Sequence, residues 1–467
     1  MPCVEEGEER ERDMYIVIVG IGKVGSTVAT YLSREGGHEV VVVDKNPNIV
    51  ERMANNFDVL GLCGNGSAPE IQEEAGMGKA DLVVALTSSD EFNILCCILA
   101  RKAGAKHTIA RVRNPDYFHQ MAFLREELGL SMAVNPELEA ANAISRMLRF
   151  PSAIKLELFS KGRLEMAEIT IPAGSILENV VLKDLPRVCS TQVLICAVRR
   201  GEEVFIPDGD FVLHAGDYIN VTASHSDMND FFKILGIYQN RIKTVLLVGG
   251  GKVAYYLARQ LIPLGMRVEI VEQNADICQS LSEALPKATI LHGDGTDQEL
   301  LLEEGLATVD ACVSLTGIDE ENVIVSMFAS MKKVKKVITK INRLPLLSIL
   351  HQLGIESVVS PRVATGELIL RYVRALHNSE GSSVQTLYKL LDGQVEALEF
   401  VVSKNAVFVE KTLEELPLKK GILLAGIVRS GRLIHPKGSD VMLPGDLVVV
   451  VTTLNGLQDL GDILAED

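Results

Sequence analysis

The sequence predicts an α/β protein with two Rossmann-like parallel-sheet domains, each followed by a small α+β module, in tandem duplication. Two observations carry this prediction. The chain resembles itself with a period of 229 residues, and short apolar strands alternate with helical stretches in the longer units. Its 467 residues allow roughly three domains, or four small ones, at about 150 residues per domain.

The internal repeat is visible as identical or similar residues that stand 229 positions apart. The matching pairs are Gly20 and Gly249, Gly64 and Gly293, Thr87 and Thr316, Asp90 and Asp319, and Asn93 and Asn322. The segment PDGDFVLHAGD from Pro207 likewise resembles PKGSDVMLPGD from Pro436. This period is too long for a solenoid, so it indicates a duplicated pair of domains.

Local composition, together with Pro and Ser/Gly-rich segments, predicts the domain boundaries. Residues 1–13 are charged and are predicted to form a disordered tail. The strands YIVIVG, EVVVVD, DLVVAL and HTIARV belong to a first Rossmann-like domain, 14–150, which a helical stretch closes before Pro151. A first small module follows at 151–238. A second Rossmann-like domain is predicted at 239–378 and a second small module at 379–467, joined by the Ser/Gly-rich run HNSEGSS.

Charge and cysteine usage exclude several classes of protein. Lys and Arg number 46 against 62 Asp and Glu, a net charge of −16, which argues against a nucleic-acid partner. Apolar runs stay well below the ~20 residues of a membrane span, and the charged N-terminal segment does not resemble a signal peptide. The eight cysteines form no CxxC pair, and Cys96 and Cys97 are expected to be buried thiols, which favours the reducing cytoplasm.

A first dinucleotide-type site is predicted where the strand IVIVG runs into Gly20-Ile21-Gly22-Lys23-Val24-Gly25, a full GxGxxG. The first glycine allows the tight turn, the second lets a pyrophosphate approach, and the third lets the helix pack on the strand. Asp44 ends the next strand, 19 residues after Gly25, where a carboxylate accepts from ribose hydroxyls and disfavours a 2′-phosphate. We therefore expect NAD rather than NADP.

The second repeat carries a variant of this motif, Gly249-Gly250-Gly251-Lys252-Val253-Ala254. Ala254 replaces the third glycine, and Glu272, 18 residues later, offers the carboxylate on a longer arm. Both repeats are therefore predicted to bind an adenosine-type ligand, and their differences leave room for different ligands.

Three other features have weaker interpretations. Arg111 and Lys340 stand 229 apart at strand ends, where a cation either pairs with phosphate or is a plain surface charge. The cluster Lys332, Lys333, Lys335 and Lys336 is expected to be a solvated helix end. His292 has no counterpart, because Cys63 stands at the matching place, so we expect it to pack or to lie at the surface.

The chain lacks the residues that an enzyme of this fold needs. A hydride-transferring enzyme requires an acid/base and an orienting cation in a substrate domain. The small modules share only turn-forming Gly, Pro and Asp, and none of the nine histidines recurs at matching positions. No GxSxG, HExxH or GxxxxGK[ST] motif is present. We expect no catalytic residue and no metal site.

This motif set resembles the regulator-of-potassium-conductance (RCK or KTN) domains. The GxGxxG unit with its terminal Asp, the GDGT-like loop, ARVRNP and the module with PxGxxxLxxGD carry the resemblance, which covers about residues 14–465. Two such pairs in one chain resemble the TrkA-type family of cytosolic regulatory subunits of Trk/Ktr potassium uptake.

The resemblance implies a nucleotide-sensing subunit that gates an integral-membrane potassium-translocating subunit. It implies a homo-oligomeric ring, a cytoplasmic location at the inner face of the membrane, and binding of NAD(H), with ATP or ADP at one of the two sites. By position, the first site would comprise Gly20 to Gly25, Asp44, Asn65, Thr87, Ser88 and Arg111. The second would comprise Gly249, Gly250, Gly251, Lys252, Val253, Glu272, Asp294 and Thr316.

Two alternatives remain from the sequence alone. One is an NAD-dependent oxidoreductase with a duplicated Rossmann fold, which the missing acid/base disfavours. The other is a nucleotide sensor of a different transporter, such as a proton-coupled exchanger, which differs only in its membrane partner.

Overall fold

The structure is a computed structural model. It describes residues 14–114, 117, 129–160, 163–237, 242–346, 350, 352–378, 384–403, 406, 408–409, 411–454, 456–457 and 459–465. The predicted tail, 1–13, lies outside the described residues. Among the described helices, none combines the length and the apolar character that crossing a bilayer requires.

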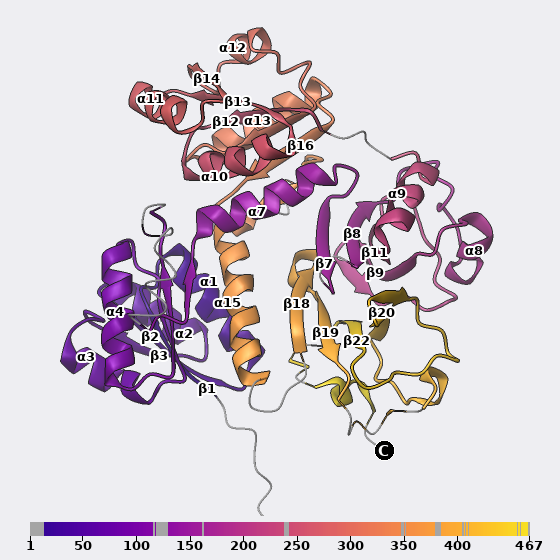
Figure 1. Cartoon of the computed structure of the whole chain (residues 1–467), viewed down its shortest axis with the longest axis horizontal. Helices are drawn as coiled ribbons and strands as arrows, with labels where there is room; N and C mark the ends of the chain where they lie inside the picture. The colour runs from indigo at the N-terminus through magenta and orange to yellow at the C-terminus, as the bar shows by residue number, and fades with distance from the viewer. Residues whose placement is uncertain are drawn as a thin grey trace, which may run out of the picture. The chain divides into compact units, whose positions relative to one another are not determined.

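The first repeat opens with a six-stranded sheet in the order β3-β2-β1-β4-β5-β6, whose neighbours pair in parallel. Figure 1 labels its first three strands. Its strands are β1 (Met14–Val19), β2 (His38–Asp44), β3 (Leu60–Cys63), β4 (Leu82–Ala85), β5 (His107–Arg111) and β6 (Met132–Val134). The connecting helices are α1 (Lys23–Glu35), α2 (Pro47–Asn56), α3 (Pro69–Glu74), η1 (Met77–Lys79) and α4 (Asp90–Ala103). Strands of almost unbroken apolar sequence fit a sheet that helices cover on both faces.

The second repeat builds the same sheet, in the order β14-β13-β12-β15-β16-β17. Its strands are β12 (Thr244–Val248), β13 (Arg267–Glu272), β14 (Thr289–His292), β15 (Ala311–Ser314), β16 (Lys336–Lys340) and β17 (Val358–Val359). Its helices are α10 (Lys252–Leu261), η3 (Ile262–Leu264), α11 (Ala275–Ala284), α12 (Gln298–Glu303), α13 (Asp319–Met331) and η4 (Leu344–Leu346). The predicted pair of Rossmann-like domains is confirmed.

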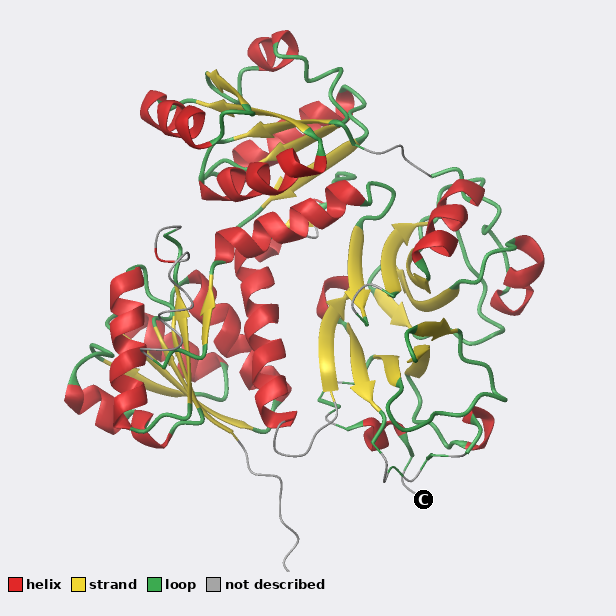
Figure 2. Cartoon of the chain, in the orientation of Figure 1, coloured by secondary structure: helices red, strands yellow, loops and turns green. Residues whose placement is uncertain are grey.

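Each small module is an antiparallel sheet of five strands, which stands out from the α/β domains in Figure 2. The first consists of β7 (Lys155–Phe159), β8 (Leu164–Thr170), η2 (Leu182–Asp184), α8 (Leu185–Val188), β9 (Leu194–Arg200), β10 (Glu203–Phe205), β11 (Tyr218–Ala223) and α9 (His225–Ile234). The second consists of β18 (Val384–Leu390), η5 (Leu391–Gly393), β19 (Val395–Val401), η6 (Leu413–Glu415), β20 (Ile422–Arg429), β21 (Arg432–Ile434), β22 (Leu447–Thr452) and η7 (Leu460–Ile463). The predicted tandem fold class is therefore confirmed.

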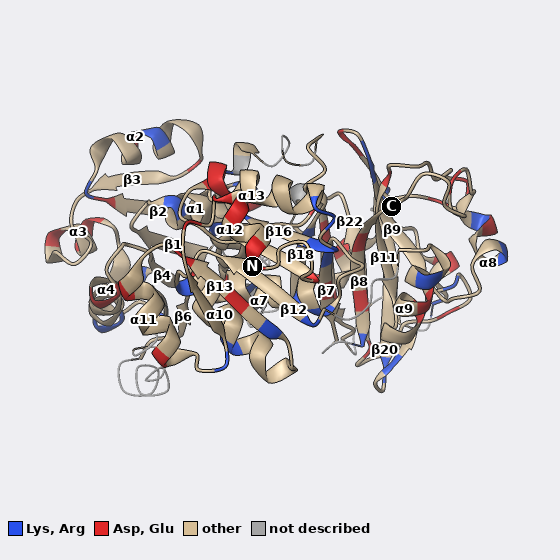
Figure 3. Ribbon diagram, turned by 90° about the horizontal axis from the view of Figure 1, so that it is seen from above, with Lys and Arg blue, Asp and Glu red and all other residues tan. Residues whose placement is uncertain are grey.

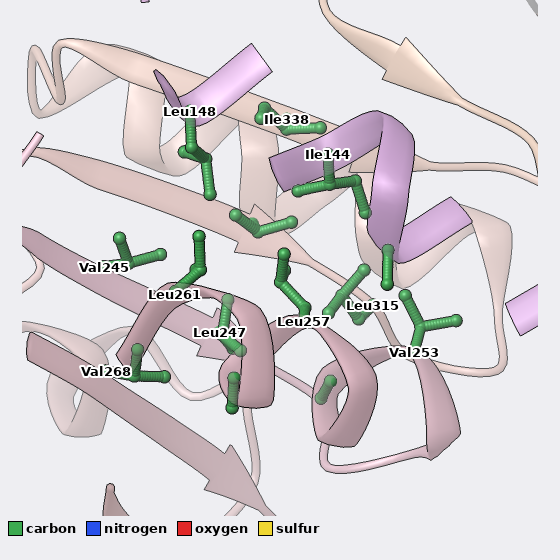
Figure 4. Close-up of a cluster of buried hydrophobic side chains, with 14 of the residues drawn as sticks. Ile144, Leu148, Val245, Leu247, Val253, Leu257, Leu261, Val268, Leu315 and Ile338 are labelled. Atoms are coloured by element: carbon green, nitrogen blue, oxygen red, sulfur yellow. The ribbon is translucent and has the colours of Figure 1, made fainter. Parts of the chain in front are cut away.

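The two helices that close the Rossmann-like segments, α7 (Pro136–Arg149) and α15 (Pro361–Asn378), do not stay with their own repeats. The chain divides into two compact units. The first holds the residues up to Pro136 together with 365–373 of α15, and the second holds 137–364 and 374 onward. In the second unit, Ile144 and Leu148 of α7 are fully buried among residues of β12 and α10 such as Leu247 and Leu257 (Figure 4). In the first unit, Tyr372 meets His107 edge to face.

Within the second unit the two small modules share an apolar core. Phe159 and Met166 of the first pack with Leu390 and Val449 of the second. Gly426 allows the close approach, because a Cβ there would lie 2.1 Å from a methyl of Leu164. Such a contact buries apolar surface that each five-stranded sheet alone would expose to water.

The repeated Gly/Asp turn pattern of the modules has a structural explanation. Asp217 and Asp446, which end the two matching segments, are almost fully buried. Each accepts a pair of hydrogen bonds from an arginine, Arg200 at 2.8 and 2.7 Å and Arg429 at 2.9 and 2.7 Å. This two-point geometry orients the strand ends in both modules.

The burial of the adjacent cysteines agrees with the prediction from the sequence. Cys96 and Cys97 are buried as predicted, and burial raises the pKa of Cys96 to about 12. Figure 3 shows basic and acidic residues interspersed on the helices and strands of each domain, in keeping with the net charge of −16.

The interpretation of the lysine cluster as a solvated helix end is wrong for one member. Lys336 begins β16 and is buried, and its Nζ donates to the carbonyl of Ala153 at 2.5 Å. Burial lowers the pKa of this ammonium to about 8, against a partial opposing influence of Glu356. The neighbouring Lys335 remains exposed and pairs with Asp310 at 2.7 Å.

The packing of α7 predicts a measurable loss in the second domain. Ile144→Ala should cost about 2–5 kcal/mol, because it opens a cavity in a closed core. Hydrogen exchange of the β12 and β15 amides should accelerate accordingly. Arg149→Ala, at an exposed position of the same helix, serves as the control. Unchanged protection of these strands in Ile144→Ala would contradict this assignment of the helix.

Lys336 predicts a pH-dependent stability. Its folded pKa of about 8 lies below the ordinary value of 10.5, so the unfolded state binds more protons between these values. Lys336 should therefore add a rise in the free energy of unfolding across that window of at most about 3 kcal/mol. Buried thiols such as Cys96 contribute with the opposite sign above their ordinary pKa, so urea titrations should show a more positive pH slope in the wild type and in Lys335→Met than in Lys336→Met. Equal slopes for the wild type and Lys336→Met would contradict it.

Candidate functional site

The candidate sites lie at the carboxyl ends of the parallel strands in each Rossmann-like domain. The first site lies in residues 14–114 and the second in residues 244–343. In each, the first glycine of the loop adopts a left-handed backbone, with φ of +90° at Gly20 and +105° at Gly249. The amide of each donates to the neighbouring strand, to Val43 and Val271, at 2.8 Å in both cases. Only glycine takes such a turn without strain.

The predicted carboxylates hold the glycine loops. One oxygen of Asp44 accepts from the Ile21 amide at 2.7 Å, and the other accepts from Asn46 at 2.9 Å. Glu272 does the same with Gly250 at 2.7 Å and with Asn274 at 2.8 Å. Since an ionised carboxyl has about four lone-pair positions, each group is held in place while keeping capacity to accept ribose hydroxyls.

A compensating pair of replacements preserves this contact between the repeats. Ile21 is buried beside the short Asp44 in the first site. At the matching place in the second, a Cβ on Gly250 would lie 3.0 Å from the Glu272 side chain and 2.7 Å from Leu281. The longer carboxylate therefore needs glycine at position 250. Both sites thus reach the same 2.7 Å hydrogen bond by different combinations of residues.

The third loop position also differs in spacing. A Cβ on Gly25 would lie 2.0 Å from the carbonyl oxygen of Gly20, so no other residue fits there without moving the loop. Ala254 occupies the matching place and is fully buried, which means that the second loop lies farther from its helix. The helix-side residues Val24 and Val253 are buried in both repeats.

The middle glycines leave open space in front of two helix N-termini. Among the described residues, nothing lies within 4 Å of a Cβ built on Gly22 or on Gly251. These residues cap α1 and α10, and as glycines they have no side chain that could accept a hydrogen bond from the first turn. Lys23 and Lys252, the first helical residues, are exposed. A helix start of this kind, with free N–H groups and a positive dipole end, suits a phosphate group.

Two buried asparagines, whose roles the sequence analysis missed, fasten the neighbouring strand ends. Asn93 accepts from the Thr87 amide at 2.8 Å and donates to the carbonyl groups of Thr87 and Arg111. Asn322 makes the same three contacts with Thr316 and Lys340. Their 229-residue spacing was the available signal, but it carried no indication of what they bind.

Asp90 and Asp319 are a second pair of matching residues that hold backbone segments together by hydrogen bonds. Asp90 accepts from the amides of Arg113 and Asn114, both at 2.8 Å, and Asp319 accepts from Asn342 and Arg343, both at 2.9 Å. Burial raises the pKa of Asp319, but hydrogen bonds from these amides outweigh it, so the net pKa is lowered. Both carboxylates therefore shape the loop after the fifth strand of the sheet.

The matched cations lie at the same edge. Arg111 donates to the carbonyl of Thr87 at 3.3 Å, and Lys340 donates to that of Leu315 at 3.0 Å. Ser88, the next predicted residue, accepts from Arg113 through its carbonyl at 2.5 Å. Both cations thus bind backbone that a Cβ on the first glycine would touch, since it would lie 2.7 Å from the Thr87 amide at Gly20 and 2.9 Å from the Leu315 carbonyl carbon at Gly249.

The loops after β3 and β14 complete the edge. Gly64 and Gly293 donate to the carbonyls of Asp44 and Glu272, at 2.9 and 3.0 Å. Asn65 and Asp294 follow them, and each accepts from a residue two positions on, Ser67 or Thr296. The Thr296 backbone and side chain lower the pKa of Asp294, which is therefore ionised at neutral pH.

The residue before each of these loops contacts the turn that follows the carboxylate. His292 is exposed, as predicted, and its Nε2 donates to the Gln273 carbonyl at 3.0 Å. Cys63, at the matching place, contacts the Lys45 carbonyl at 3.7 Å. The strand pairing places them beside Glu272 and Asp44 respectively. The carboxyl end of each sheet thus combines backbone amides that can donate to a phosphate with a carboxylate that can accept from ribose hydroxyls. This combination is suited to binding a nucleotide.

Comparison with known proteins agrees with this architecture. The TrkA-N domain family matches residues 16–136 and 245–361, and the TrkA-C domain family matches 166–236 and 397–465. The Trk system potassium uptake protein TrkA homolog 1 of Methanosarcina mazei is 33% identical and covers 96% of this chain and 99% of its own. The TrkA protein of Haemophilus influenzae is 28% identical, over 94% of this chain and 95% of its own.

Solved structures share the fold. The GsuK RCK domain aligns with a TM-score of 0.58 at 17% identity and covers 97% of this chain and 94% of that chain. The GsuK channel bound to NAD aligns with a TM-score of 0.59, also at 17% identity, over 97% of this chain and 78% of that chain.

The fold is one of tandem Rossmann-like domains and small modules shared with the GsuK RCK domain, with a glycine loop at the end of the first strand of each parallel sheet. The chain belongs to the TrkA family. The relatives reported above are named as potassium uptake proteins and not as oxidoreductases, the alternative weighed from the sequence.

The spacing at the third loop position predicts that matched substitutions differ in whether they displace the loop. Gly25→Ala should lower stability by about 1–3 kcal/mol, because the loop must move away from the helix. Ala254→Gly removes a methyl group and should cost about 1 kcal/mol through helix propensity alone. Thermal unfolding measures both, and amide exchange at Ile21 and Gly250 reports the loops. A displaced second loop with an undisturbed first loop would contradict the geometry.

Proposed function

We propose that the chain is a nucleotide-sensing regulatory subunit that gates a membrane potassium transporter of the Trk/Ktr type. NAD(H) is the proposed ligand, with ATP or ADP at one of the two sites. The observation that carries this proposal is the duplicated edge itself. In both repeats a carboxylate accepts at 2.7 Å from the glycine loop, in front of an open helix N-terminus.

The relatives support the potassium system as the target. Those reported above are named Trk system potassium uptake proteins, and they span nearly the full length of this chain. The GsuK channel, which shares the fold, has been seen with NAD and is a channel by name. We extend both properties to this chain: nucleotide binding at the glycine loops, and action on a membrane protein that carries potassium.

The mechanism that we propose is linkage between ligand and conformation. A ligand shifts a gate only by the difference between its affinities for the two states. Phosphate bound at Gly22 would also contact the loop held by Asp44, so that binding alters the edge where Asn93 and Asp90 fasten the strand ends. A homo-oligomeric ring at the inner face of the membrane would pass this change to the integral-membrane subunit.

A regulator of another transporter, such as a proton-coupled exchanger, remains the second proposal. It makes the same use of the nucleotide sites and differs in the membrane partner. Potassium uptake measured beside exchange activity separates the two.

The test uses substitutions that the fold tolerates and the ligand does not. Gly22→Asp and Gly251→Asp place a carboxylate in open space, where it would repel a phosphate group. Calorimetric titrations with NADH, NAD, ATP and ADP should show that each variant loses one site, by about tenfold or more. These changes are cleaner than replacing Asp44 or Glu272, whose removal would leave a loop amide without its acceptor.

Gly209→Asp, on an exposed turn of the first small module, provides the matched control. Low-potassium growth and uptake should be followed in cells whose own TrkA-family protein has been deleted. Loss of nucleotide binding with an unchanged nucleotide response of uptake would refute the gating proposal. Steady NADH consumption with an oxo-acid substrate would return the oxidoreductase to consideration.

A further inference from the structure

The two sites are built alike but differ in charge. Equivalent positions can be identified by equivalent contacts rather than by spacing. Lys45 and Gln273 follow the carboxylates, and their carbonyls receive the contacts of Cys63 and His292. Asn65 and Asp294 open the loop after the third strand, as described above. Phe92 and Glu321 lie in the first turns of α4 and α13, one residue before the asparagine fasteners.

Each of these three replacements makes the second site more negative by one charge. Lys45 gives way to a neutral amide, and Asn65 and Phe92 give way to carboxylates. The cations that face the loops are balanced, because Lys23 matches Lys252 and Arg111 matches Lys340. The difference of about three charges therefore arises around a shared framework, and it acts on any charged ligand bound there.

Lys45 stands where this difference would be felt most. Its ammonium lies 5.5 Å from the centre of the Phe92 ring, within cation–π distance. Strand β1 lies between β2 and β4 in the sheet. A side chain that starts at the end of β2 and reaches the helix after β4 must therefore cross the end of β1, where the glycine loop begins. The distance to Phe92 and the strand order together place the cation near the carboxyl end of β1, from which the glycine loop starts.

The second site has neither residue of this cation–π pair. Gln273 carries no charge, and Glu321 replaces the aromatic ring. Asp294 adds a carboxylate that is held ionised by its hydrogen bonds to Thr296. A ligand with a terminal phosphate would meet more electrostatic repulsion there than a dinucleotide would. The pyrophosphate of a dinucleotide is esterified on both sides and therefore carries less negative charge.

We propose that the two repeats select ligands by charge, the first site favouring nucleoside di- and triphosphates and the second favouring NAD(H), with Lys45 as the specificity-determining cation of the first site. This inference rests on the proposed nucleotide-sensing function and adds the assignment of ligands to repeats. Lys45 lies free of the glycine-loop hydrogen bonds, so it acts on ligand charge without being needed for loop geometry.

The experiment reads each site alone in the full chain. Gly251→Asp isolates the first site and Gly22→Asp isolates the second, and ATP and NADH are titrated against both. We expect the ATP-to-NADH affinity ratio to be higher at the first site. Lys45→Gln should lower that ratio about fivefold, and Gln273→Lys should raise the ratio at the second site by a similar factor, as an exposed ion pair does.

Lys79→Gln provides the matched control, because η1 precedes β4 and so lies at the opposite end of the sheet. Raising the salt concentration should shrink the effect of Lys45→Gln but not that of a merely structural change. The reciprocal pair Asn65→Asp and Asp294→Asn should move the ratios in the same directions as the lysine pair.

The outcomes separate this inference from the function on which it rests. If neither isolated site binds any nucleotide, the proposed function itself fails. If both sites bind but Lys45→Gln leaves the ratio unchanged, or weakens ATP and NADH equally and independently of salt, the selection by charge is refuted while nucleotide sensing stands.

Discussion

The hydrogen bond between a strand-end carboxylate and a glycine-loop amide is the contact on which the rest of each site depends. It holds the loop at the end of the first strand, and the orientation of the loop determines where the helix N-terminus points. It also leaves the carboxylate with unused lone pairs facing outward. The same 2.7 Å distance recurs in both repeats although neither the carboxylate nor the loop residue is the same. Duplicated domains that diverge elsewhere have kept this distance.

Much of the framework was predictable because it depends on local sequence. A left-handed turn requires glycine, and a parallel sheet requires short apolar strands, so Gly20, Gly249 and the two parallel sheets follow from pattern alone. The carboxylates were predictable from spacing. Asn93 and Asp90 were visible as repeated residues, yet their contacts with the end of β5 and the loop after it span 18 to 24 residues of chain and could not be predicted from their neighbours.

Features that depend on packing between segments far apart in the chain could not be predicted from the sequence. Helix α7 follows the first sheet directly, so its placement with the second domain contradicts the simplest reading of chain order. Its apolar stripe does not by itself tell which sheet it covers, because the choice depends on packing with residues far along the chain. Lys336 escaped for a similar reason: a lysine in a basic run looks solvated, and the carbonyl that receives it belongs to a segment 183 residues away. The paired replacement of Ile21 and Asp44 by Gly250 and Glu272 could likewise be recognised only in the structure. In the sequence, neither replacement indicates that it compensates for the other.

Under the proposed function, carrying two nucleotide sites in one chain changes what each ligand must achieve. Moving a two-state gate from almost closed to almost open needs roughly 10⁴-fold discrimination between the states, about 5.5 kcal/mol. A single exposed nucleotide site that supplied all of this would need to bind one state very tightly and release it slowly. Two sites that share the task need only about 100-fold each, because their free energies add when the states are common to both. If the sites also differ in the ligand charge that they prefer, the sum becomes a comparison of two metabolic signals. Duplication followed by a few charge changes around a preserved loop is a short route to such a device.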